Sequence, residues 1–175
     1  LTLDYPIQLL YKSLRKIIEK PNNHLTLKIA GRPAKECIDY LSEMDKQCGN
    51  FEFIYSGYLS HKKSVKLLES ADCLLLLIPN IKENKGILTG KIFEYIGSGK
   101  VIWGFGPEKG DAQKILTDCD AGSIFENYEI ATDTLQKYIN EDTSGANLEN
   151  REKYTRGELA KMILSRIIKD LEKKG

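Results

Sequence analysis

Thr89, Gly90 and Lys91 open a short helical stretch, and the types and order of these residues suit the binding of an anion. If Thr89 is the N-cap of that helix, the next backbone N–H groups have no partners within the helix and are free to donate to a ligand. Gly90 lets a ligand approach the backbone closely, and Lys91 adds a full positive charge to the positive end of the helix dipole. A phosphate or diphosphate group fits these features. A capped helix whose Lys91 points into water is the alternative interpretation.

Glu94 follows on the same stretch, on the side of the helix that also carries Lys91. The two side chains are three residues apart and could form an ion pair worth about 0.2–0.5 kcal/mol. A functional alternative is that Glu94 accepts hydrogen bonds from the hydroxyls of a sugar or ribose, because a carboxylate beside a phosphate site otherwise repels the ligand. The residues alone leave both interpretations open.

Gly31, Gly57 and Tyr58 each follow a segment with the pattern of a β-strand. Both glycines could allow a ligand close to the backbone, although glycines that simply form turns are commoner. Tyr58 could stack on a nucleotide base, with packing against its own chain as the alternative. Together with Thr89, Gly90, Lys91 and Glu94, these residues form our candidate set for a binding site.

The elements that must position these residues alternate along the chain. Strands are expected at residues 25–30, 51–55, 74–78, 101–104 and 122–125, with helices before, between and after them. This alternation predicts an α/β fold, namely a Rossmann-like three-layer domain with a parallel sheet of about five to six strands and helices on both faces. We expect residues 1–175 to form one such domain. A last helix would place Leu159, Met162, Ile163, Ile167 and Leu171 on one side.

The order of elements places the candidate residues at one edge of this sheet. In open parallel sheets, ligands bind outside the carboxyl ends of the strands. Gly31 and Gly57 follow two strands, and a polar loop of about ten residues, longer than most connections, leads from a third strand to Thr89. We therefore expect the anion site in the crevice at this edge.

Composition excludes several classes of function. The net charge is +1, which gives no argument for binding nucleic acid. No apolar run has the length of a transmembrane helix, and the N-terminus lacks the pattern of a signal peptide. The four cysteines are too widely spaced for a zinc or thioredoxin-type site, so we expect free thiols in a reducing cytoplasm. The first residue is Leu1, which we interpret as a domain cut from a longer protein.

Residues 86–100, which read Gly-Ile-Leu-Thr-Gly-Lys-Ile-Phe-Glu-Tyr-Ile-Gly-Ser-Gly-Lys, resemble the donor-binding segment of GT-B glycosyltransferases. The resemblance is closest to the C-terminal domains of the bacterial group 1, or family 4-like, enzymes. Supporting segments follow in the same order at residues 28–31, 53–58, 68–76 and 106–110. The resemblance covers nearly the whole chain.

This resemblance implies two Rossmann-like domains, of which this chain is the C-terminal one that holds a nucleotide-diphosphate sugar. Glu94 would then bond ribose hydroxyls, the Thr89–Lys91 region would hold the diphosphate, and Tyr58 would lie near the base. No metal or other cofactor is expected. The full enzyme would transfer the sugar to an acceptor hydroxyl, in the synthesis of a surface polysaccharide or glycoconjugate. The acceptor-binding N-terminal domain is the implied partner, and it is absent, so the fragment alone should not turn over.

One position departs from the family pattern. Many relatives carry a second glutamate eight residues before Glu94, where this chain has Gly86. The opening segment also resembles a start after the first strand of such a domain. Two alternatives stay open, namely a sugar-nucleotide epimerase of the same architecture and a non-catalytic Rossmann-like interaction module. The basic last segment leaves a peripheral contact with the inner membrane face as a further alternative.

Overall fold

The computed structural model describes residues 5–20, 22–140, 148–155, 157–158, 161 and 164–165. The strands of this part are β1 (Leu25–Ile29), β2 (Phe51–Tyr55), β3 (Cys73–Leu77), β4 (Val101–Phe105) and β5 (Gly122–Phe125). The longer helices are α1 (Ile7–Ile18), α2 (Lys35–Gln47), α3 (His61–Glu69), α4 (Lys91–Ser98), α5 (Asp111–Asp118) and α6 (Tyr128–Asn140). Short elements are η1 (Asn84–Gly86), α7 (Leu148–Arg151) and η2 (Glu152–Tyr154). The alternation expected from the sequence is confirmed, and the fold is α/β and Rossmann-like.

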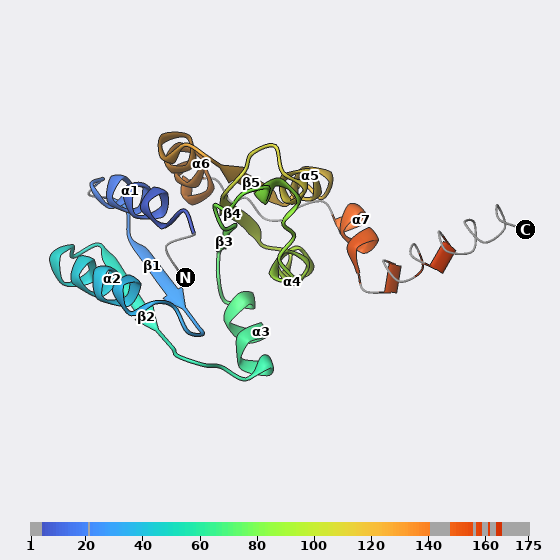
Figure 1. Ribbon diagram of the computed structural model, residues 1–175. Helices are drawn as coiled ribbons and strands as arrows, with labels where there is room; N and C mark the ends of the chain where they lie inside the picture. The colour runs from blue at the N-terminus through green and yellow to red at the C-terminus, as the bar shows by residue number, and fades with distance from the viewer. Residues whose placement is uncertain are drawn as a thin grey trace, which may run out of the picture.

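The strands pair in parallel, but they form two sheets instead of the single sheet of five to six strands that we expected (Figure 1). One sheet pairs β1 with β2, and the other has the order β3-β4-β5. The expectation was wrong on this point because β1 and β3 are not hydrogen-bonded neighbours. Every crossover still runs through a helix, as parallel pairing requires.

The three-stranded sheet is covered on both faces, which confirms the expected three layers for this half. On one face, Leu74, Leu76, Ile102 and Ile124 pack with residues of α4 and α5. On the other face, Trp103, Phe105 and Phe125 pack with Ala131 and Leu135 of α6. Side chains alternate between the two faces of a strand, so the continuous apolar run in β3 packs against the helices on both faces of the sheet.

Within the part of the chain that the structure describes, the two-stranded sheet has helices on one face only. Leu27 and Phe51 face the cluster that includes residues of α1 and α2. The opposite face carries Thr26, Lys28, Glu52 and Ile54, all of which are exposed. None of the residues of α3 is buried, so α3 does not cover this face.

Helix α1 joins the two halves. Its Tyr11 ring stacks on Tyr40 of α2 at 3.9 Å between ring centroids. On its other flank, the Ser13 hydroxyl donates a hydrogen bond of 3.1 Å to the Tyr128 carbonyl oxygen at the start of α6. Leu10 and Leu14 between these flanks are fully buried. The helix therefore packs between α2 and α6 and contributes to one hydrophobic cluster that strands of both sheets share.

Two boundaries differ from the sequence expectations. Strand β4 runs one residue further than the expected 101–104, to Phe105, and within it a Cβ on Gly104 would approach Ile124 Cγ1 to 2.9 Å, which explains the glycine. The polar stretch 141–150 has the composition of a loop, yet helix α7 begins within it, at Leu148. The apolar side expected for the last helix, with Leu159, Met162, Ile163, Ile167 and Leu171, lies outside the described residues.

Candidate functional site

The start of α4 presents backbone donors, although Thr89 does not cap the helix as expected. Gly90 is already helical, with φ −55° and ψ −23°, and the first turn is closed by a 3.0 Å hydrogen bond from the Ile92 N–H to the Thr89 carbonyl. The Thr89 Oγ1 atom is buried and has no hydrogen-bond partner among the described residues. The backbone N–H groups of Gly90 and Lys91 likewise have no described acceptor. These are the groups that an anion at a helix N-terminus would engage.

Lys91 and Glu94 project into solvent from the same helix. Both are exposed, while Ile92 and Ile96 on the opposite side are fully buried. No ion pair between Lys91 and Glu94 is found within the described residues, so the interpretation of a simple intrahelical pair gains no support. Burial, and then the charge of Glu94, raise the pKa of the neighbouring Tyr95. A cation and a carboxylate are thus presented together beside free backbone donors.

The loop before α4 is held in place by α5. The Asn84 amide nitrogen donates a 3.3 Å hydrogen bond to the Pro79 carbonyl, which tightens the loop. Gly110, just before α5, lies so close to the loop that a Cβ there would come within 3.0 Å of the Lys85 carbonyl. Gly86, where the resemblance places a second glutamate in many relatives, lies against α5, and its Cβ position is 4.0 Å from Asp111 Oδ2.

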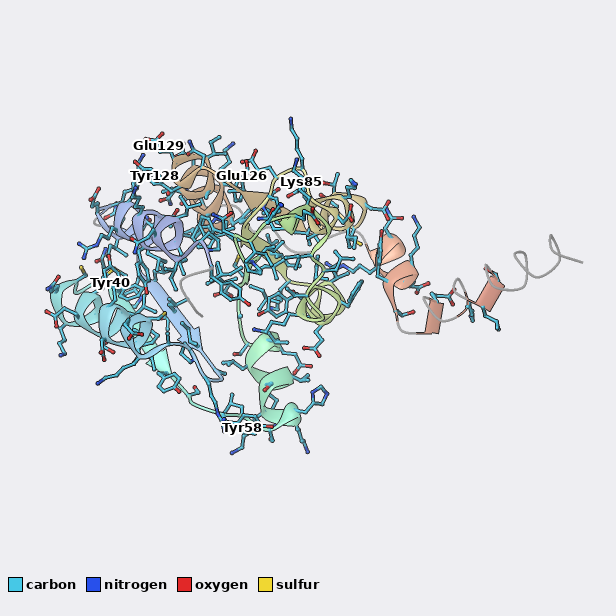
Figure 2. All side chains as sticks on the ribbon, in the orientation of Figure 1. Tyr40, Tyr58, Lys85, Glu126, Tyr128 and Glu129 are labelled. Atoms are coloured by element: carbon cyan, nitrogen blue, oxygen red, sulfur yellow. The ribbon has the colours of Figure 1, made fainter. Side chains whose placement is uncertain are left out.

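Gly31 and Gly57 meet at the carboxyl ends of β1 and β2. The Gly31 N–H donates a 2.6 Å hydrogen bond to the Gly57 carbonyl, and the Tyr55 hydroxyl donates to the Gly31 carbonyl at 3.1 Å. Their φ angles are +108° and +61°, so glycine suits both positions on conformation alone. Tyr58 is 81% exposed and does not pack on its own chain (Figure 2).

The structure thus forms two groups from the candidate residues. Gly31, Gly57 and Tyr58 lie at the end of the two-stranded sheet, and Thr89, Gly90, Lys91 and Glu94 lie at the loop and helix after β3. Among the described residues, no hydrogen bond or ion pair joins the two groups. They come from different sheets, on either side of the place where β1 and β3 fail to pair.

Open space surrounds the Cβ positions of all three candidate glycines. A Cβ built on Gly31, Gly57 or Gly90 would meet no atom within 4 Å. For Gly90 the helical φ of −55° also removes any conformational reason for glycine. Neither the backbone conformation nor the packing of the described residues therefore requires a glycine at position 90, whereas close approach of a ligand would.

Two shallow hollows of the described surface lie elsewhere. One, of about 540 Å³, lies between Glu108 and Asp118 along α5, and another, of about 340 Å³, lies between α1 and Tyr128. Neither includes a candidate residue. Among the described residues, no group of three or more His, Cys, Asp or Glu side chains is arranged to hold a metal ion. None of the described helices is long and apolar enough to cross a membrane.

Sequence reasoning did not single out Arg151. This arginine is 7% exposed, and its Nε and Nη2 atoms have no hydrogen-bond partner among the described residues. Burial lowers the pKa of its guanidinium group. It packs where α4 ends, since a Cβ on Gly99 would lie 2.8 Å from Arg151 Nη1. A single arginine in a basic segment has no sequence pattern from which its burial at the end of α4 could have been predicted.

The fold and these positions define an α/β protein of Rossmann-like type with candidate ligand groups at the carboxyl edge of its parallel strands. No protein-family model and no curated protein sequence matches the chain. Among solved structures, it is similar to WaaG, a glycosyltransferase involved in lipopolysaccharide biosynthesis. The TM-score is 0.54 with 17% sequence identity, over 89% of this chain and 39% of the WaaG chain. At this identity the likeness shows the fold, and this chain spans well under half the length of that protein.

Proposed function

We propose that this chain is the donor-binding domain of a glycosyltransferase that uses a nucleotide-diphosphate sugar. The observation that carries the proposal is Gly90, a glycine at the start of a helix where no described residue requires one. The likeness in fold to a glycosyltransferase supports the same conclusion. The identity of the acceptor, the identity of the sugar and the transfer reaction are properties that we assign to a longer protein, of which this chain would be one domain.

In this proposal different residues bind different parts of the nucleotide-sugar donor. The free N–H groups of Gly90 and Lys91, the helix dipole and the Lys91 ammonium group hold the diphosphate. These donors stabilise the charge that develops on the leaving diphosphate, so no metal is needed for that step. Glu94 accepts hydrogen bonds from the ribose hydroxyls, and Tyr58 stacks on the base above Gly57.

The rest of the donor pocket comes from the partner domain of the same polypeptide. Transfer requires an acceptor hydroxyl facing the sugar, and an N-terminal domain across the cleft would supply its binding site. The proposal places the enzyme in the cytoplasm, in the synthesis of a surface polysaccharide or glycoconjugate, with a peripheral membrane contact through the basic C-terminal segment as an option. The four free cysteines are in keeping with a reducing compartment.

A nucleotide titration followed by amide NMR tests the proposal. UDP, GDP and ADP are added separately to this chain and to the longer natural protein. We expect saturable shifts at Gly90, Lys91 and Glu94 for one nucleotide, and that nucleotide names the base. Glu94→Ala should weaken the response, because it removes the acceptor for the ribose hydroxyls.

Glu83→Ala is a matched control, since Glu83 is also an exposed carboxylate and lies in the loop before α4, outside the candidate set. It should leave the nucleotide shifts as they are. Absence of any shift in the longer protein with all three nucleotides would contradict the proposal and favour an interaction module. Conversion of a nucleotide sugar to its epimer without an acceptor would favour the epimerase alternative.

A further inference from the structure

Strand β5 is the last strand in the order β3-β4-β5, so one of its edges faces no described strand. The Ile102 N–H donates to the Ala121 carbonyl at 2.7 Å, and the Gly106 N–H donates to the Phe125 carbonyl at 3.2 Å. The odd residues of this stretch therefore point their backbone groups at β4, and even residues such as Ile124 point theirs outward. An open edge of this kind is a template on which another strand can pair.

Two side chains accept the hydrogen bonds of the outward N–H groups. The Oε1 atom of Gln113, which lies on α5, accepts from the Ile124 N–H at 2.6 Å. The Oε1 atom of Glu108, in the loop before α5, accepts from the Glu126 N–H at 3.0 Å, just beyond the end of β5 (Figure 2). The two acceptors thus contact successive outward positions, where the carbonyl groups of a neighbouring strand would lie in a wider sheet.

The Gln113 amide is held in the orientation that this contact needs. Its Nε2 atom donates to the Thr117 Oγ1 atom, one turn further along α5, at 2.9 Å. Because the donor and the acceptor of an amide lie on different sides of the group, this second bond directs Oε1 to the strand. Gln113 is half-buried and Ile124 is buried, so the contact is partly shielded from water. A buried N–H that loses its acceptor is unfavourable.

Without these two acceptors the edge of β5 would suit a second copy of itself. In an antiparallel pairing centred on Ile124, Ser123 would oppose Phe125 of the second copy, and Gly122 would oppose Glu126. No like charges would face one another in this pairing, so charge repulsion does not protect the edge. Protection therefore depends on the side chains that already occupy the outward N–H groups.

We propose that Gln113 and Glu108 block the outer edge of β5 and so prevent two copies of this chain from pairing there edge to edge. The two side chains take the hydrogen bonds that a partner strand would otherwise make. Pairing then only exchanges existing hydrogen bonds for new ones, which gains little free energy. The inference does not rest on the proposed function.

Sedimentation velocity tests the proposal on variants of the two acceptors. The double variant Gln113→Met, Glu108→Met keeps the approximate length of both side chains and removes both acceptors. We expect it to self-associate at least about tenfold more tightly than the wild type, because each outward N–H then gains a partner only by pairing. The control Gln113→Glu, Glu108→Gln keeps an acceptor oxygen at each position and should associate no more than the wild type.

A second control separates the loss of acceptors from the gain of apolar surface. Lys109→Met, Lys114→Met places two methionines in the lining of the same hollow along α5, which Glu108 and Gln113 also line. It leaves both acceptors in place and should associate like the wild type. Equal association of the two methionine double variants would overturn the proposal, as would an acceptor-free variant that associates no more than the wild type.

Amide exchange of the wild-type protein gives a test that requires no substitution. We expect the Ile124 and Glu126 amides to exchange at least about tenfold more slowly than unstructured amides, although no described strand pairs with them. Rapid exchange at Ile124 would overturn the proposal. In Gln113→Met, at concentrations where it is monomeric, Ile124 should lose most of this protection, whereas Phe125, whose N–H faces β4, should keep its own. Unchanged protection of Ile124 in that variant would also overturn the proposal.

Discussion

Gly90, just before α4, and Gly97, within it, have the same conformational and steric freedom but different positions relative to the candidate site. Gly90 and Gly97 are both exposed, and a Cβ on either would meet no atom within 4 Å. Neither has a positive φ, so alanine fits both positions without strain. Only Gly90 lies at the end of the helix where the candidate anion donors are. The comparison separates the intrinsic effect of alanine from the loss of room for a ligand.

Gly90→Ala and Gly97→Ala should therefore have similar effects on stability and different effects on binding. Each should raise the free energy of unfolding by about 0.4–1 kcal/mol, because alanine has less freedom than glycine in the unfolded chain. Gly90→Ala should weaken nucleotide binding in the titration, whereas Gly97→Ala should not. Urea denaturation and the NMR titration provide the measurements. Equal nucleotide affinity in the two variants would contradict the role given to Gly90.

The Cys73 thiol makes stability depend on pH. Burial, with a smaller effect from the charge of Asp72, raises the pKa of this thiol from 9.0 to about 12. Between these values the folded state keeps a proton that the unfolded state releases, so stability falls as the pH rises through this window. Cys73→Ala should reduce this decline, by at most about 1.4 kcal/mol per pH unit.

Urea unfolding of the wild type and of Cys73→Ala at pH 7 and pH 10 measures the effect. At pH 7 the difference between the two proteins reflects packing alone, and it serves as the reference. The same decline with pH in both proteins would show that Cys73 is not responsible. The remaining decline is then expected from other groups, such as Tyr154, whose pKa is raised to about 12, first by burial.

At the scale of the element, α4 is fixed along its buried side and at its C-terminal end. Its buried side, Ile92 and Ile96, packs on the three-stranded sheet. Its last turn ends at Gly99, which has φ +83°, and next to Gly99 lies the buried Arg151. The Phe93 ring also stacks on Tyr154 of η2 at 6.4 Å. The segment of α7 and η2 therefore contacts the helix that carries Lys91 and Glu94.

Gly99→Ala should destabilise the protein, in contrast to Gly97→Ala two residues earlier. The new Cβ meets both a left-handed backbone conformation and the Arg151 Nη1 atom at 2.8 Å. We expect a loss of about 1–2 kcal/mol in the free energy of unfolding. Thermal or urea denaturation measures it. A stability equal to that of Gly97→Ala would mean that α4 ends without this constraint.

Most elements could be predicted because their signals are local. The apolar spacing of Leu10, Leu14 and Ile17 marks α1, and the run from Leu74 marks β3 as buried on both faces. The N-cap of α4 was not predictable in the same way. Thr89 has the residue type of a cap, yet a tight first turn with Gly90 already helical leaves its hydroxyl without a role in capping.

At the scale of the whole molecule, the two sheets depend on one shared cluster. Leu41 of α2 and Trp103 of β4 belong to the same hydrophobic cluster, which α1 closes. Leu116 of α5 belongs to the cluster on the other face of the three-stranded sheet. Trp103 is the sole tryptophan and is buried, with its Nε1 donating to the Ala131 carbonyl at 2.9 Å. Its fluorescence therefore reports on the sheet between the two clusters.

Leu41→Ala and Leu116→Ala should each lower the free energy of unfolding by about 2–5 kcal/mol, because both side chains are fully buried. In each variant the transition seen by Trp103 fluorescence should coincide with that seen by far-UV circular dichroism, since α1 couples the halves. A Leu41→Ala protein that loses helix signal while the Trp103 transition stays unchanged would show that the two-stranded half unfolds separately.

The sequence by itself determined the class of fold, the order of the elements and the candidate residues, because each of these follows from spacing and residue type over a few turns. The tertiary structure decided how the strands assemble, since pairing joins residues far apart in the chain and depends on which strands are present. It also decided which glycines are structural. Gly104 is confined by Ile124 of the neighbouring strand, whereas Gly90 faces open space, and only packing distinguishes the two.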